Sequence, residues 1–148
     1  MQFNTFNFLI NYVVMVIVGM AFNPMNVLAY RLSDIYISRT LFYGGLLMGA
    51  NMIWSHEIIH YLIHSVFNKM VFYFGVSLSI IITFFLLRSQ YKISDNQWLK
   101  RMISHHSTAL TTSNKILERS NNYKVVALAK QIIDTQEKEI KLMKELIK

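Results

Sequence analysis

The sequence predicts an all-α protein in which three transmembrane helices precede a two-helix amphipathic hairpin. The first reason is the uneven placement of charge, because only three of the 15 basic and two of the eight acidic residues lie at or before Leu87. The second is a change of pattern after Arg88, where long apolar runs give way to apolar residues spaced three and four apart. We therefore expect a transmembrane domain over residues 1–90 and a helical hairpin domain over residues 91–148.

Three apolar runs are long enough to cross a hydrocarbon core of about 30 Å at roughly 1.5 Å per residue. Residues 1–30 carry no charged side chain, which predicts a first span at about 8–28 with Pro24 near its end. Further runs predict spans at about 41–63 and 70–87. No basic residue precedes Arg31, so a cleaved signal peptide is not indicated. The lipid bilayer is the first expected partner, and residues 30–39 are expected to form a loop in water.

Two amphipathic helices are expected beyond the third span. Ser94 and Gln97 have the spacing of a capping box, so the first helix should begin near Asp95 and end at the polar turn 120–122. Two such helices cannot bury both apolar stripes on each other alone, so a homodimer that completes a four-helix bundle is expected. The expected inward faces are Leu99, Met102, Ile103, His106, Leu110, Ser113 and Leu117 on the first helix, and Val125, Ala129, Ile132, Gln136, Ile140, Met143 and Ile147 on the second.

Side chains that can bind a metal ion gather on this hairpin if its helices run antiparallel. Thioether and imidazole groups suit Cu(I), and nitrogen with oxygen suits Cu(II), so copper fits this set. In the alternative interpretation the methionines fill the core, one histidine is an interior residue and the other faces water. The set consists of Met102, His105 and His106 on the first helix, and Gln136, Glu139 and Met143 on the second.

The segments Trp98 to Ser107 and Ala129 to Met143 resemble the family catalogued as domain of unknown function 305. The shared pattern is a Met, two residues and a His pair, followed later by Gln, two residues, Glu-Ile, two residues and Met. That family is ferritin-like and includes CopM-type copper-binding proteins as well as three-span membrane members. The resemblance implies half of a ferritin-like four-helix bundle, with copper bound at positions that here are Met102, His105, His106 and Met143.

The second predicted span holds another series of potential ligands at steps of four residues. A copper path along this series is one interpretation, and ordinary core methionines with histidines near the interface are the other. His56 to His60 also matches H-E-x-x-H, in which two histidines bind zinc and the glutamate is a general base. We interpret this match as fortuitous, since no third ligand motif accompanies it, and do not expect an enzyme. The series is Met48, Met52, His56, His60 and His64.

The charges that flank the spans leave two orientations open. Arg31, Arg39, Arg88 and Lys92 lie on one side of the predicted membrane and Lys69 on the other, so the positive-inside rule places the tail in the cytoplasm. The family resemblance places the tail on the extracytoplasmic side, and we adopt that expectation. The tail's lysines alternate with glutamates and lack an aromatic platform for bases, so no nucleic-acid partner is expected.

The function expected from these features is copper handling or sequestration by a multi-pass membrane protein. Tail hairpins would pair as a homo-oligomer and surround one ion with side chains of the metal-binding set. The alternative is a structural or interaction protein, in which the spans anchor a hairpin that oligomerises or docks a partner without metal. The ligands expected around the ion are Met102, His105, His106, Glu139 and Met143.

Overall fold

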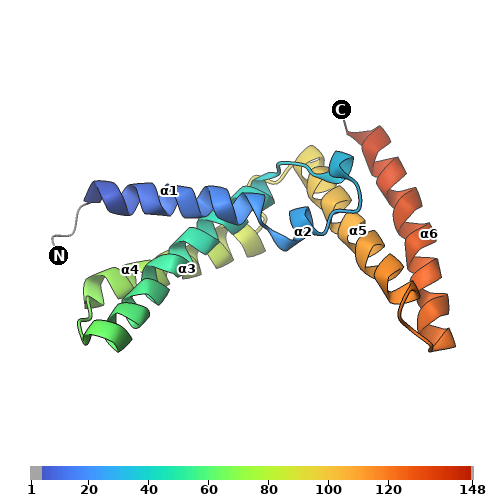
Figure 1. The fold of residues 1–148 in the computed structure, drawn as a ribbon. Helices are drawn as coiled ribbons and strands as arrows, with labels where there is room; N and C mark the ends of the chain where they lie inside the picture. Colours follow the sequence, from blue (N-terminus) through green and yellow to red (C-terminus); the bar gives the residue numbers. More distant parts are fainter. Residues whose placement is uncertain (1–4, 148) are drawn as a thin grey trace. The chain divides into compact units, whose positions relative to one another are not determined.

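The computed structural model describes residues 5–147, and the regular elements in this range are helices (Figure 1). These residues form two compact units. The first contains residues 5–21 and 39–92, and the second contains residues 22–38 and 93–147. Residues 22–38, which we expected to group with the spans, therefore group with the tail hairpin. Residues 1–4 and 148 of the expected domains lie outside the described part of the chain.

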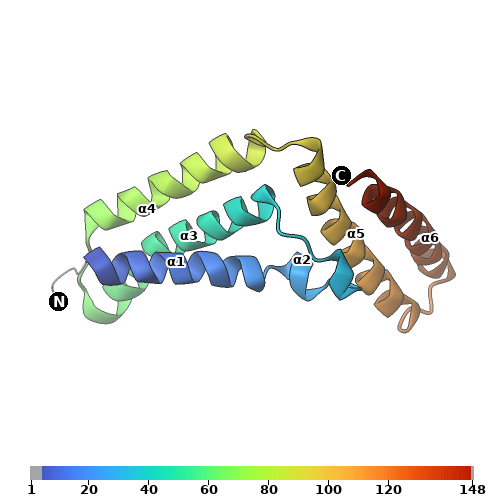
Figure 2. The ribbon, with the colours of Figure 1, turned by 90° about the horizontal axis from the view of Figure 1, so that it is seen from above.

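The first unit is built around one long helix, α3 (Arg39–His64). This helix packs against α1 (Thr5–Ala21) and against α4 (Lys69–Ile81), which continues into the π-helix η2 (Ile82–Arg88) (Figure 2). Ser65 ends α3 with a left-handed backbone, φ 55°, and its N–H still donates to the Tyr61 carbonyl at 2.8 Å. Asn68 then caps α4 by accepting hydrogen bonds from the N–H groups of Met70 and Val71.

Two segments of the described chain are long and apolar enough to cross a membrane, Phe8–Val27 and Lys69–Arg88, each of 20 residues. Only 11% of the apolar window in each is buried inside the protein, unlike the core helix of a soluble protein. α3, expected to be the second of three spans, does not reach the same hydropathy because it carries Glu57 and several other polar side chains.

Glycines on α3 allow α1 to approach closely. Gly45 and Gly49 are spaced one turn apart, a pattern that predicts close helix packing without saying which helix is the neighbour. In the structure that neighbour is α1, since both glycines lie against Val16, and Gly49 also faces the ring of Tyr12. The Tyr12 hydroxyl donates to the carbonyl of Leu46 at 3.2 Å, which adds a polar contact to the same seam.

The second unit is a helical hairpin covered by an irregular segment. Helix α5 (Asp95–Leu117) packs along α6 (Tyr123–Leu146), while the short helices α2 (Pro24–Val27) and η1 (Leu32–Asp34) contact α5. The start of α5 at Asp95 is where the capping pattern predicts it. Ser94 has the extended backbone of an N-cap residue, but its side chain makes no capping hydrogen bond.

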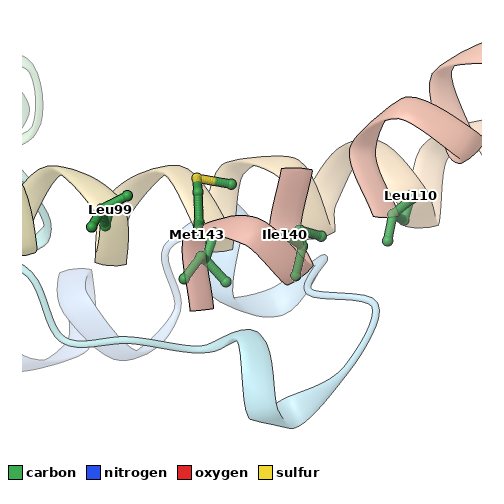
Figure 3. Close-up of a cluster of buried hydrophobic side chains, with 5 residues drawn as sticks. Leu99, Leu110, Ile140 and Met143 are labelled. Atoms are coloured by element: carbon green, nitrogen blue, oxygen red, sulfur yellow. The ribbon is translucent and has the colours of Figure 1, made fainter. Parts of the chain in front are cut away.

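The core of the second unit is one apolar seam between α5 and α6. Leu99 and Leu110 from α5 and Ile140 and Met143 from α6 lie along this seam, together with the fully buried Ile103 (Figure 3). The expected inward residues Met102 and His106 are half-buried at its edge, and Val125 near the interhelical turn is exposed. The hairpin is therefore better packed at the end that holds Leu99 and Met143 than at its turn.

The α1–α3 contact predicts that Gly45→Ala lowers the free energy of unfolding of the first unit by about 1–3 kcal/mol. The added Cβ would lie 2.8 Å from the carbonyl oxygen of Val16, which is backbone and cannot move aside cheaply. Gly44→Ala is the matched control, because no atom lies within 4 Å of its added Cβ. SDS-induced unfolding of the detergent-purified protein, followed by circular dichroism, measures both variants. Equal effects of the two variants would contradict the glycine contact.

Candidate metal site on the tail hairpin

A buried carboxylate fixes the arrangement of the second unit. Asp34 is fully buried, and its Oδ2 accepts a hydrogen bond from the Ser107 hydroxyl of α5 at 2.8 Å. Its Oδ1 accepts a hydrogen bond from the Lys144 ammonium group of α6. One side chain from the segment before α3 thus joins both hairpin helices, and we call Asp34, Ser107 and Lys144 the Asp34 clasp.

Backbone hydrogen bonds hold the same segment against α5. The N–H of Tyr30 donates to Ser107 Oγ at 2.8 Å, and Ser104 Oγ donates to the carbonyl oxygen of Asp34 at 2.9 Å. Both serines are buried, so each satisfies a buried polar group of the segment. The sequence offers no signal for these contacts, because a serine on a helix can equally well face solvent.

His106 is the candidate ligand whose orientation the structure determines best. Its Nδ1 lies 2.8 Å from the carbonyl oxygen of Met102, and its Nε2 lies 2.9 Å from Glu139 Oε2 on α6. A carbonyl can only accept, so Nδ1 carries the hydrogen. Nε2 then faces the carboxylate, so the two groups form an ion pair when His106 carries a second proton, and they are the side chains that would hold a metal ion here. The His106 side chain is only 12% exposed.

The other expected ligands of the hairpin differ in their surroundings from His106 and Glu139. Met143 belongs to the buried seam, and Met102 packs against that seam from α5. His105 is exposed, with its ring centroid 5.7 Å from that of His106. Gln136 donates a hydrogen bond to Glu139 Oε2 at 3.3 Å. Across residues 5–147 no group of three or more His, Asp or Glu side chains is placed to hold a metal ion.

The expected ligands on α3 lie in the first unit. Met48 lies against Gly19 of α1, Met52 is half-buried, and three histidines follow along the helix. His56 and His64 are exposed and His60 is half-buried.

Glu57, the glutamate of the H-E-x-x-H match, is 7% exposed and has a structural contact. Its Oε2 accepts a hydrogen bond from the N–H of Asn68 at 3.1 Å. Because Asn68 caps α4, the carboxylate holds the turn between α3 and α4. This contact accounts for a glutamate at this position without a general base.

Comparisons with known proteins place the tail in a described family. The profile of the family "Domain of unknown function (DUF305)" matches residues 86–147. The chain is 33% identical over 128 residues to the protein described as "Uncharacterized protein L153" of Acanthamoeba polyphaga mimivirus, an alignment that covers 84% of this chain and 81% of the relative. No solved structure matches the chain significantly.

The Asp34 clasp predicts that Asp34→Asn lowers the free energy of unfolding of the second unit by about 3 kcal/mol. This is the lower end of the range for breaking a buried ion pair, because the Lys144 side chain is 32% exposed. Asp134→Asn is the matched control, since it removes an exposed pair with Lys138 worth about 0.3–0.5 kcal/mol. Trp98 fluorescence during denaturation, in a Trp54→Phe background, reports the second unit. Equal stability of the two variants would contradict the clasp.

Proposed function

The chain belongs to the DUF305 family, and we propose that it is a three-span membrane protein whose helical tail binds a copper ion between α5 and α6. The observation that carries the metal proposal is the orientation of His106, which has Nδ1 fixed by the Met102 carbonyl and Nε2 directed at Glu139. The proposed role is copper handling or sequestration, without catalysis.

The surface of the first unit supports a membrane location. Soluble proteins rarely expose contiguous apolar patches larger than a few hundred Å². Here many large apolar side chains are at least 44% exposed along both candidate spans, which would be costly in water and is favourable in lipid. They include Leu9, Ile10, Val13, Val14 and Ile17 on α1, and Phe74, Ile80, Ile81, Phe84 and Phe85 on α4 and η2.

Contacts within the second unit support the proposal that α3 also crosses the membrane, between the two candidate spans. Residues 30–36 bind α5 and α6, so this segment and the hairpin must lie on the same side of a membrane. The chain between them contains α3 and the apolar segment Lys69–Arg88. If Lys69–Arg88 crossed the bilayer and α3 did not, residues 30–36 and the hairpin would lie on opposite sides. The Asp34 clasp would then not form. The polar groups of α3 are compatible with this placement, because its Glu57 is buried against protein.

The donor set around His106 suits copper. The imidazole Nε2 and the Glu139 carboxylate are 2.9 Å apart, and small side-chain shifts would place both on one ion. Met102 and Met143 supply thioethers at the adjacent seam, and His105 supplies a second imidazole on the exposed side. Nitrogen and oxygen ligands suit Cu(II), and sulfur with imidazole suits Cu(I), so this neighbourhood contains ligands for both oxidation states.

The copper proposal predicts that Glu139→Gln weakens Cu(II) binding by at least about 10-fold, the lower end of the loss for a partner that only supports a ligand, and that the His105→Ala, His106→Ala double variant abolishes the tail site. Glu139 is 47% exposed, so its isosteric replacement should leave the hairpin folded. Glu145→Gln, an exposed position on the same helix, is the control. Copper titration of the full-length protein in mild detergent measures the affinity. Unchanged binding in Glu139→Gln and in the double variant would exclude the proposed site.

The three-span proposal predicts that Leu32→Cys and Asn121→Cys react from the same side of the membrane and Val66→Cys from the other. The chain contains no cysteine, and all three positions are exposed. With the proposed extracytoplasmic tail, a membrane-impermeant maleimide labels Leu32→Cys and Asn121→Cys in intact cells, and Val66→Cys only after permeabilisation. The inverse pattern would overturn the orientation alone. Labelling of residues 32 and 121 from opposite sides would overturn the three-span topology.

A second candidate function, self-association of the tail without metal, is favoured by an apolar depression near the hairpin turn. Ile116 of α5 and Leu128 of α6 line this depression and are 40% and 57% exposed. A second hairpin seated on this depression would complete a four-helix bundle. The depression is lined by Thr112, Ser113, Ile116, Val125, Leu128, Ala129 and Ile132.

Self-association through the depression predicts that Leu128→Asp converts oligomers into monomers in detergent. Leu142→Asp is the control, because Leu142 is 55% exposed on α6 and does not line the depression. Native mass spectrometry in the presence of a chelator measures the oligomeric state. A monomeric unmodified protein, or equal effects of the two substitutions, would exclude this function.

A further inference from the structure

We propose that His60 and His64 on α3 form a second metal site, a two-histidine chelate for a divalent transition-metal ion. His56, His60 and His64 follow one another at single turns of the helix, so their rings lie in a row. The two steps of this row differ in geometry. The His56 and His60 rings are nearly parallel, at 16° with centroids 6.1 Å apart, whereas the His60 and His64 rings are tilted by 56° with centroids 5.0 Å apart.

The geometry of the His60–His64 pair fits a shared ion. Two imidazole nitrogens at about 2.0–2.1 Å from one ion, separated by an angle of roughly 90–110°, place the ring centroids about 4.5–5.2 Å apart. The observed 5.0 Å lies in this range, and the 6.1 Å of the His56–His60 pair lies outside it. Nearly parallel rings also do not direct two nitrogen lone pairs at one point. The structure therefore favours His60 with His64 over His60 with His56.

The turn between α3 and α4 determines the tautomer of His60. Its Nδ1 lies 3.1 Å from the carbonyl oxygen of Val66, which can only accept a hydrogen bond. The hydrogen is thus held on Nδ1, and Nε2 keeps the lone pair that a metal ion needs. The carboxylate of Glu57 stabilises the same turn by binding the N–H of Asn68. His60 is oriented before any ion binds, as is common for metal-binding histidines.

The chemistry of the pair defines the class of ion. Two neutral imidazoles without a thiolate suit Cu²⁺, Ni²⁺ or Zn²⁺, with Cu²⁺ bound most tightly of the three. His64 is exposed, so water can complete the coordination, and no third His, Asp or Glu of residues 5–147 joins the pair. The site lies in the first unit and shares no residue with the tail site in the second.

The test uses the full-length protein in mild detergent, in a His105→Ala, His106→Ala background that removes the proposed tail ligands. Cu²⁺ titration followed by electron paramagnetic resonance is expected to show one remaining site with nitrogen hyperfine coupling. His64→Ala should lower the Cu²⁺ affinity of this site by at least about 10-fold. Removing a residue that only supports a metal ligand already costs roughly 10–100-fold, and His64 is proposed to bind the ion itself. His56→Ala, one turn further from the pair, should leave the affinity unchanged.

Three results would overturn the second site: no Cu²⁺ binding in the background protein, binding unaffected by His64→Ala, or an equal loss in His56→Ala. Circular dichroism of each variant establishes that α3 remains folded, which is expected because His64 and His56 are both exposed. The tail site is tested separately, by comparing copper binding of the unmodified chain with that of the Glu139→Gln variant and of the His105→Ala, His106→Ala background protein. Failure of one site therefore leaves the result for the other unaffected.

Discussion

A carboxylate shielded from solvent remains charged only if hydrogen bonds and an opposite charge replace its hydration. Asp34 meets this requirement with Ser107 on α5 and Lys144 on α6, so the segment before α3 and both hairpin helices must assemble together. The clasp consequently links parts of the chain about 70 and 110 residues apart. In a membrane protein the same contact restricts the topology, because only parts exposed on one side of the bilayer can form it. The proposal that α3 is a span therefore rests on this restriction and not on the hydropathy of α3.

The two proposed metal sites use the same physical device in different surroundings. In each, a backbone carbonyl accepts the Nδ1 hydrogen of a histidine and leaves Nε2 free of that hydrogen: the carbonyl of Met102 does so for His106, and the carbonyl of Val66 does so for His60. The neighbours of Nε2 then determine what each site can bind. His106 faces a carboxylate with thioethers nearby, which suits copper in either oxidation state, whereas His60 has the exposed imidazole of His64 beside it, which suits a divalent ion.

The parts of the fold predicted from the sequence are those set by local patterns. The apolar runs and the periodicity of the tail predict helices at 39–64 and 95–117 to within a few residues, because hydrophobic spacing and polar turns act over single helical turns. The polar residues of segment 30–39 predict an irregular segment, which the structure has apart from the short helix η1, but they do not predict its packing on α5. That packing depends on Asp34, Ser104 and Ser107 meeting across about 70 residues, and each looks like a solvent-exposed residue in isolation. Ligand types on the hairpin and the inward position of His106 are likewise visible in the sequence, whereas the 2.9 Å contact between His106 Nε2 and Glu139 Oε2 depends on how α5 is rotated against α6.

The segment before α3 and the tail hairpin form one compact unit, and we propose that this unit lies on one side of a membrane. A bifunctional maleimide applied to a chain with Arg31→Cys and Glu137→Cys tests it most directly, because these side chains form an exposed ion pair at 2.8 Å and the sequence has no other cysteine. Neither substitution disturbs the Asp34 clasp. The account predicts a cross-link within single chains in intact membranes, detected after proteolysis by mass spectrometry. Labelling of both cysteines without an intramolecular cross-link would contradict it.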